Sequence, residues 1–345
     1  MRHRSVRLFA SLAFLGFCAG TGHAADDGFY KGKTIRIVIG TSVGGSYGVF
    51  SQLAARHLGR YIPGNPALVP VSMPGAGGLV ALNYLANVAP RDGTTISVIH
   101  VTIVQESLFN AKAKFNARDF TWIGRMDSLA FVGLASKASG IRSLEDARKR
   151  TVVAGAPGVN NVPAQSPLIL NKLTGTKFRL ISGYSGIGPT FLALKRGEVE
   201  TSVTSLAGIG SILAADVRSG ALIPFFVQAR KRLPQFPNLP AIVEFAKTDV
   251  EKNFMNVFTL SSDIGRTLAA PPGVPTDRLA ILRAAWRKMM DDENFKADAK
   301  KTGLDLDPMS GEELTKLVRD ATEMDAGMRE KVKAFYDQII SSAGK

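Results

Sequence analysis

Cysteine and histidine are scarce in this chain, and their scarcity excludes several kinds of chemistry. The 345 residues contain one cysteine, Cys18, and four histidines. A disulfide framework and a cysteine-based metal site are therefore excluded. The few histidines also leave little room for a histidine-based zinc site or a catalytic triad.

The first 24 residues have the pattern of a secretory signal rather than of a folded element. Three arginines precede an apolar run at residues 8–18, which is too short to span a bilayer. Gly22 and Ala24 then supply the small residues of a cleavage site. We therefore expect a signal peptide at residues 1–24, a periplasmic location, and a mature chain without cysteine.

Long hydrophobic runs and blocks of one charge are missing from the chain after residue 24. No segment after residue 24 reaches about 18 apolar residues without a charge, so we expect no membrane-spanning helix. The net charge is +14, but Lys and Arg are dispersed in short runs such as residues 148–150 and 230–232. Without interleaved aromatic residues, this pattern does not indicate a nucleic-acid partner. A dispersed positive field would instead steer anionic solutes toward a site.

The rest of the sequence alternates β-branched runs, glycine-rich turns and helical apolar periodicity. These patterns predict strands at residues 34–39, 67–73, 95–101, 131–136, 151–154, 178–181, 200–204 and 222–228. They predict helices at 49–61, 79–88, 103–109, 164–173 and 189–196, and a short one capped by Ser143. The C-terminal part is predicted to be helical, with a Thr276 cap and a capping box of Ser310 and Glu313 that begins a final helix reaching about residue 340.

This alternation predicts an α/β protein with mostly parallel sheets. Two similar halves without a flexible linker indicate two lobes that share crossing strands. We expect lobe 1 at residues 25–130, lobe 2 at 131–229, and a return to lobe 1 with C-terminal helices at 230–345.

Four glycine-rich loops each follow an expected strand and precede an expected helix, at residues 44–46, 74–78, 155–161 and 183–188. In open α/β sheets ligands bind beyond the carboxyl ends of the strands, where helix N-termini attract anions. Hydroxyl groups beside these glycines could add directed hydrogen bonds, from Thr41, Ser42, Ser46, Tyr47, Tyr184 and Ser185. The alternative for any single loop is that its glycines only turn the chain. Neither nucleotide-binding glycine motif is present, so no cofactor is expected.

Several segments, in order along nearly the whole chain after residue 24, carry a family resemblance. They include YKGKTIRIV (30–38), PGAGG (74–78), APRDGTT (89–95), DFTWIG (119–124), GALIP (220–224), LPAIVE (239–244) and APPGVP (270–275). In these segments the chain resembles the extracytoplasmic solute receptors of tripartite tricarboxylate transporters, the Bug family.

The resemblance implies a type II periplasmic-binding-protein fold with a ligand cleft between two lobes. It also implies a small carboxylate ligand and delivery to the permease subunits of a tripartite transporter. We expect a monomer without enzymatic activity. The family's binding loops fall on Gly44, Gly45 and Ser46, on Gly75, Ala76 and Gly77, and in the far lobe on Gly158, Val159, Asn160 and Asn161 and on Tyr184, Ser185 and Gly186.

The chain departs from the family pattern at the first and third loops. Gly48 stands where the family often has an aspartate, and Val159-Asn160 stands where it usually has Gly-Ser. Without that carboxylate, an amino-acid ligand that needs a partner for its ammonium group is disfavoured.

Two histidines remain after residue 24. His57 lies close to the apolar stripe of a predicted helix, so we expect it to pack in the core. His100 closes a predicted strand at its ligand-facing end and is a candidate ligand contact.

Two alternative functions stay open: a sensor of the same fold that presents its solute to a signalling partner, and an exported serine hydrolase that uses Ser185 and His100. The hydrolase is disfavoured because G-x-S-x-G is not matched.

Overall fold

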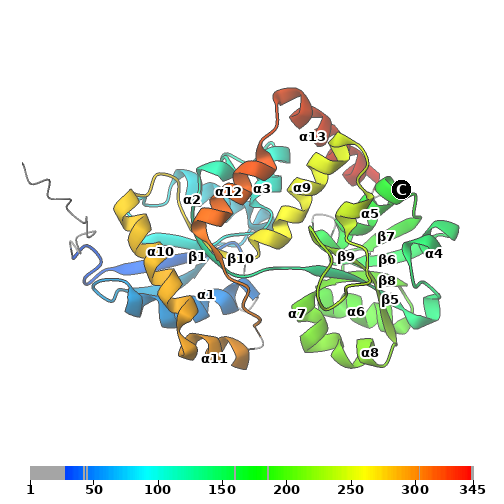
Figure 1. Cartoon of the computed structure of the whole chain (residues 1–345), viewed down its shortest axis with the longest axis horizontal. Coiled ribbons are helices and arrows are strands. Elements are labelled where there is room, and N and C mark those ends of the chain that lie inside the picture. The colour runs from blue at the N-terminus through cyan, green and yellow to red at the C-terminus, as the bar shows by residue number, and fades with distance from the viewer. Residues whose placement is uncertain are drawn as a thin grey trace, which may run out of the picture.

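The computed structural model describes residues 28–342, except for Ser42, Gly44, Gly45, Val159, Asn160, Ser185 and Gly303. The predicted signal peptide lies outside these residues. Two mixed sheets, each flanked by helices, form two lobes that lie side by side in Figure 1.

The first lobe contains β1 (Thr34–Ile39), β2 (Ala67–Ser72), β3 (Thr95–Val98), β4 (Thr121–Asp127), β10 (Arg266–Ala270) and β11 (Met309–Ser310), with helices α1 (Ser46–His57), α2 (Leu79–Asn87), α3 (Ile103–Phe109), α10 (Thr276–Asp291), α11 (Glu293–Lys301) and α12 (Gly311–Thr322). The second contains β5 (Phe131–Ser136), β6 (Val152–Ala156), β7 (Phe178–Ser182), β8 (Thr201–Ser205) and β9 (Leu222–Gln228), with helices α4 (Leu144–Lys149), α5 (Val162–Thr174), α6 (Ile187–Arg196), α7 (Leu206–Gly208) and α8 (Ala214–Arg218). Helices α9 (Asp249–Ile264) and α13 (Ala326–Ser341) lie at the junction.

The strand order is β11-β4-β10-β3-β1-β2 in the first sheet and β7-β6-β8-β5-β9 in the second. Most strands of each sheet run in one direction, as the sequence predicts; β10 and β11 are reversed in the first sheet, and β5 in the second. The reversal of β5 and β10 follows from the chain path. Strand β5 begins at the junction between the lobes, where its neighbours β8 and β9 end. Strand β10 also begins at the junction, where its neighbours β3 and β4 end.

The two lobes are joined at this edge by tight backbone contacts. Residues 128–130 connect β4 to β5, and the amide of Leu129 donates to the Ser262 carbonyl at 2.9 Å. The Ser262 hydroxyl donates to the carbonyl of Gln228, at the end of β9, at 3.3 Å. Gly265 has φ +50°, and a Cβ there would overlap the Asp127 carbonyl oxygen. The crossing segments are therefore closely packed against one another at the junction.

A hydrophobic core runs through the junction as well as through each lobe. One cluster of buried residues includes Trp122 of the first lobe and Phe226 of the second. Phe254 of α9 contributes to it and packs on Phe335 of α13, with ring centroids 5.1 Å apart. Helix α13 contacts α5 as well as α3 and α9, so the C-terminal helix touches both lobes.

The structure corrects two expectations about the C-terminal part. Helix α10 begins at Thr276, but its N-cap position is Pro275, so Thr276 is not the cap. The final helix is two helices, because the chain leaves the helical conformation after Thr322 and Asp325 caps α13. The predicted capping box of Ser310 and Glu313 is confirmed.

None of the helices in the described part of the chain combines the length and the apolar character that a bilayer-spanning helix requires. Within the same residues, no group of three or more His, Cys, Asp or Glu side chains is placed to hold a metal ion.

Candidate functional site

Three loops of the first lobe meet at the carboxyl ends of β1, β2 and β3. These strands are neighbours in the sheet, so the segments that follow them lie together. The Ser72 hydroxyl donates to the Thr41 carbonyl at 2.8 Å. A Cβ on Gly40 would stand 2.8 Å from the Cα of Gly78, and one on Gly78 would stand 2.9 Å from the His100 ring. Thr41, the second glycine loop and His100 therefore share one edge.

The second glycine loop has a backbone that side chains rarely adopt. Gly75, Ala76, Gly77 and Gly78 all have positive φ, at 143°, 46°, 64° and 95°. Ala76 and Gly77 are exposed, and a Cβ added to Gly77 would have no atom within 4 Å. The loop leads directly into α2, so exposed backbone lies at the positive end of a helix dipole. Exposed backbone at a helix N-terminus is a common place for anion binding.

Tyr47 and His100 form a stacked pair at the same edge. Their ring centroids are 5.2 Å apart with 12° between the planes. The Tyr47 hydroxyl accepts a hydrogen bond from the Val101 amide at 3.1 Å, so this side chain is held between α1 and the loop after β3. Tyr47 is almost fully buried. Its predicted contact with a ligand stays a prediction.

His100 is a neutral hydrogen-bonding group near pH 7. Burial, helped by the charge of Arg266, lowers its pKa to about 4. Its Nδ1 lies 2.8 Å from the Thr102 hydroxyl and accepts from the Thr102 amide at 3.5 Å. His100 is therefore a neutral imidazole at the edge of the site.

The second lobe brings two loops to the corresponding edge of its sheet. The Gly183 amide donates to the Pro157 carbonyl at 3.2 Å, which ties the loop after β7 to the loop after β6. Asn161 caps α5, because its Oδ1 accepts from the Ala164 amide at 3.1 Å. Gly158, Asn161, Tyr184 and Gly186 thus lie on neighbouring loops that lead into α5 and α6.

Several predicted site residues fall outside this description. Ser42, Gly44, Gly45, Val159, Asn160 and Ser185 are outside the described residues, as is the side chain of Ser46.

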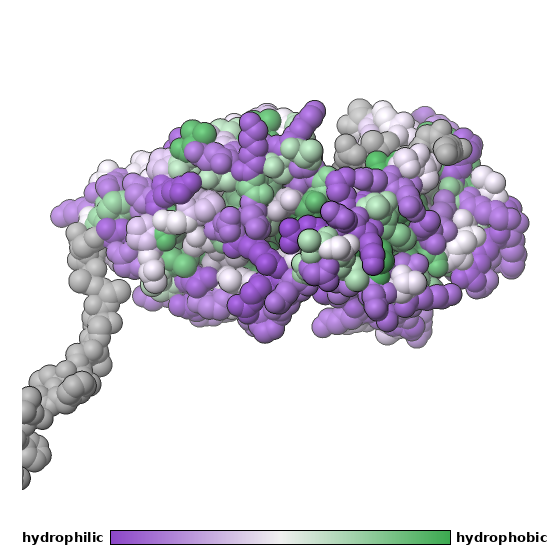
Figure 2. Space-filling view, turned by 90° about the horizontal axis from the view of Figure 1, so that it is seen from above, coloured by the Kyte–Doolittle hydropathy of each residue, from purple (hydrophilic) through white to green (hydrophobic). Residues whose placement is uncertain are grey.

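The two edges face the same junction, since β4 continues through three residues into β5. Seen from above, the outline of the molecule is indented between the lobes (Figure 2).

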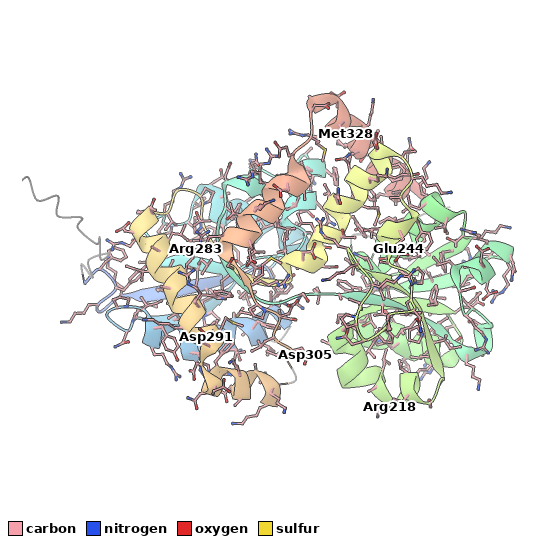
Figure 3. All side chains as sticks on the ribbon, in the orientation of Figure 1. Arg218, Glu244, Arg283, Asp291, Asp305 and Met328 are labelled. Carbon is pink, nitrogen blue, oxygen red and sulfur yellow. The ribbon has the colours of Figure 1, made fainter. Side chains whose placement is uncertain are left out.

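A separate open cavity of about 410 Å³ lies at the turn between α12 and α13, lined by residues that include Met328, labelled at the top of Figure 3. None of the strand-end loops lines this cavity, so the junction between the lobes is the candidate site.

Arg266 is a charged residue near the site that sequence reasoning missed. It begins β10, pairs in register with Asp127, and is 7% exposed. Its guanidinium carbon lies 4.8 Å from the Tyr47 ring centroid and 5.6 Å from that of Phe50. Strand β10 was not predicted, so nothing in the sequence placed this arginine next to His100.

Asp127 is the acidic neighbour of Arg266. Burial raises the pKa of Asp127 to about 7, although the charges of Arg266 and Arg125 oppose this shift and those of Asp307 and Asp305 add to it. Arg125 itself donates to the Asp307 carboxylate at 2.8 Å. Asp127 is therefore only partly ionised near pH 7.

His57 lies away from this edge and has the packing role expected of it. It is buried, and its Nε2 lies 2.9 Å from Asp298 Oδ2. Its ring meets Phe295 edge-on at 5.5 Å. Both partners are on α11, so His57 fastens α1 to α11.

Comparison with known proteins agrees with the fold and with the family resemblance. The model of the tripartite tricarboxylate transporter family receptor matches residues 60–333. A UPF0065 protein of Cupriavidus necator is 24% identical over 330 residues, which is 94% of each chain. A solute-binding protein of this family from Polaromonas has a TM-score of 0.67 at 19% identity, over 91% of this chain and 99% of that one. An R. palustris protein solved with adipate has a TM-score of 0.61 at 19% identity, over 91% and 98%. The chain therefore belongs to the tripartite tricarboxylate transporter family receptors.

Proposed function

We propose that this protein is a periplasmic receptor that captures a small carboxylate between its two lobes and delivers it to the membrane permease of a tripartite transporter. The observation that carries the proposal is the pairing of two loop-bearing edges at one junction. Each edge presents glycine-rich backbone at helix N-termini, which favour anions over neutral groups.

The first edge supplies two kinds of hydrogen-bond donor to a carboxylate. Backbone around Ala76 and Gly77 is exposed at the start of α2. The neutral His100 adds an imidazole N–H in the tautomer that carries its hydrogen on Nε2. A neutral donor suits a carboxylate that must later be released, because hydrogen bonds to charged donors are roughly twice as strong.

The second edge closes on the ligand from the other side. Its loops around Gly158 and Gly186 lead into α5 and α6. In the proposed cycle the lobes rotate about the packed segments at residues 128–130 and 262–265, and ligand contacts to both edges favour the closed form. The related protein solved with adipate supports a small dicarboxylate as one candidate ligand.

The first test is a thermal-shift screen of the exported protein against mono-, di- and tricarboxylates, amino acids, aromatic acids and sugars. A ligand at 1,000 times its dissociation constant adds about 4 kcal/mol to stability, which is a readily measured rise in Tm. We expect hits among the carboxylates. Silence across all carboxylates, in protein that native mass spectrometry shows to carry no ligand, would refute the proposal.

A matched pair of variants tests the position of the site. Gly77 and Gly175 have similar φ, 64° and 74°, and a Cβ on either meets no atom within 4 Å. Gly77 lies at the proposed site, whereas Gly175 ends α5 at the far edge of its sheet. We expect Gly77→Val to abolish ligand binding and Gly175→Val to leave it unchanged. Equal affinities would remove the second loop from the site.

Delivery to a permease is tested in cells. Deletion of the gene should abolish uptake of the radiolabelled ligand, and expression of the protein should restore it. Normal uptake with a lost transcriptional response would instead favour the sensor alternative.

A further inference from the structure

Helix α13 crosses the junction and contacts helices of both lobes. It runs from the turn after α12 toward the second lobe, where it ends close to α5 (Figure 1). Its buried residues, Val332, Phe335 and Ile339, recur at helical spacing and form one face. The helix contacts α9 at the junction, α3 of the first lobe and α5 of the second. Helix α13 therefore connects the lobes at a second place, in addition to the crossing segments.

Tyr336 of α13 contacts one helix from each lobe. Its ring stacks on Phe109, the last residue of α3, with the ring centroids 4.7 Å apart and 18° between the planes. Its hydroxyl accepts a hydrogen bond from Nε2 of Gln165, a buried residue of α5, at 3.5 Å. A single side chain thus links α3 to α5.

Both of the helices that Tyr336 contacts begin at the candidate site. Helix α3 starts just after His100, with Thr102 at its N-cap position. Helix α5 starts just after Asn161, and the Gln165 amide donates to the Asn161 carbonyl at 3.0 Å. Each helix moves as a unit with the loop that precedes it. The spacing between the two edges of the site therefore depends on how α3 and α5 are held relative to each other.

The contacts of α13 with α3 and α9 are closer than its contacts with α5. The stack on α3 is supported by Phe254 of α9, which packs on Phe335, and Gln105 of α3 donates to the Phe258 carbonyl of α9 at 3.2 Å. On the α5 side, the Gln165 hydrogen bond is joined by Lys172, whose Nζ lies 5.8 Å from the Phe335 ring centroid. Both of these contacts are long for interactions of their kind. When the lobes rotate, α13 should therefore stay with α3 and α9 while α5 moves against it.

We propose that Tyr336 is a positioning residue that sets the spacing between the two edges of the candidate site by linking α3 to α5. It acts without touching the ligand. Its hydrogen bond with Gln165 favours one arrangement of the lobes, so the loss of this bond should change the populations of the arrangements. The consequence for ligand capture rests on the proposed function, whereas the spacing of the lobes can be measured without a ligand.

The test measures the distance between the lobes by double electron–electron resonance, in exported protein that native mass spectrometry shows to carry no ligand. The one cysteine of the chain, Cys18, lies in the predicted signal peptide, so Arg218→Cys and Asp291→Cys supply the two spin-label sites. Both residues are exposed, one on each lobe, and both are labelled in Figure 3.

Two single variants remove the hydrogen bond from its two sides. Tyr336→Phe keeps the ring stack and removes the hydroxyl, and Gln165→Met keeps a side chain of similar length and removes the donor. Each should change the ratio of the populated inter-lobe distances about two- to fivefold, as expected for the loss of one hydrogen bond. Because both variants remove the same bond, the double variant should have no larger effect than either single variant.

A control variant separates positioning from a general loosening of the fold. His57→Ala removes a contact between α1 and α11, within the first lobe, and should leave the inter-lobe distances unchanged. Circular dichroism confirms that each variant is folded. Unchanged distances in both single variants, additive effects in the double variant, or an equal change in His57→Ala would overturn the inference while leaving the receptor function intact. Silence in the carboxylate screen would instead refute the proposed function and leave the inter-lobe distances as they are.

Discussion

Gly78 packs closely against the His100 ring at the candidate site, and Gly78→Ala tests that packing. A Cβ on Gly78 would stand 2.9 Å from Cγ and Cδ2 of His100 and 3.2 Å from its Cβ. These atoms include the base of the side chain, so the ring must turn away and leave its stack on Tyr47. We therefore expect both stability and ligand affinity to fall.

The magnitude follows from two contributions. Gly78 has φ +95°, and a residue with a Cβ in left-handed backbone costs about 1–2 kcal/mol. Forcing an extra carbon into a packed site costs about 1–3 kcal/mol more. Gly77→Ala is the matched control, because Gly77 also has positive φ but open space around its Cβ. It should lose only the first contribution.

The assay is urea unfolding of both variants, with the free energy taken from linear extrapolation. We expect Gly78→Ala to lose about 2–5 kcal/mol and Gly77→Ala about 1–2 kcal/mol. The NMR signals of His100 should shift in Gly78→Ala. Equal losses in the two variants, with an unmoved His100 signal, would refute the reasoning that the loop is fitted against this ring.

Two further predictions concern charge and the core. Because the pKa of Asp127 is about 7, this carboxyl is neutral below pH 6 and ionised above pH 8, where it offsets the charge of Arg266. The affinity for a carboxylate ligand, measured by titration calorimetry, should therefore weaken as the pH rises from 6 to 8. The Asp127→Asn variant should show little change of affinity over this pH range. An affinity that rises from pH 6 to 8 would contradict the prediction. His57→Ala breaks the partly buried contact with Asp298, so urea unfolding should show a loss of about 1–3 kcal/mol, with the ligand dissociation constant unchanged. A lost affinity would mean that the packing of α11 reaches the site.

Much of the local structure could be predicted because its signals lie within a few residues of one another. The strands at residues 131–136 and 222–228 and the helix at 103–109 match the structure to the residue. The caps at Ser143 and Ser310 are also confirmed, since each side chain accepts from the amide three residues ahead. Helix α9 was not predicted; residues such as Phe254 are buried against helices from distant parts of the chain, including α13, α12 and α3.

The sequence by itself determined the alternation of strand, glycine loop and helix, because β-branched runs, glycines and apolar periodicity act locally. It therefore placed each glycine loop at the start of a helix. Only the tertiary structure decided which loops meet. The order β10-β3-β1-β2 is not the chain order, and it alone places Arg266 behind Tyr47 and Gly78 against His100. Contacts between residues so far apart depend on strand pairing and on the path of the chain between the lobes, and no local pattern encodes either.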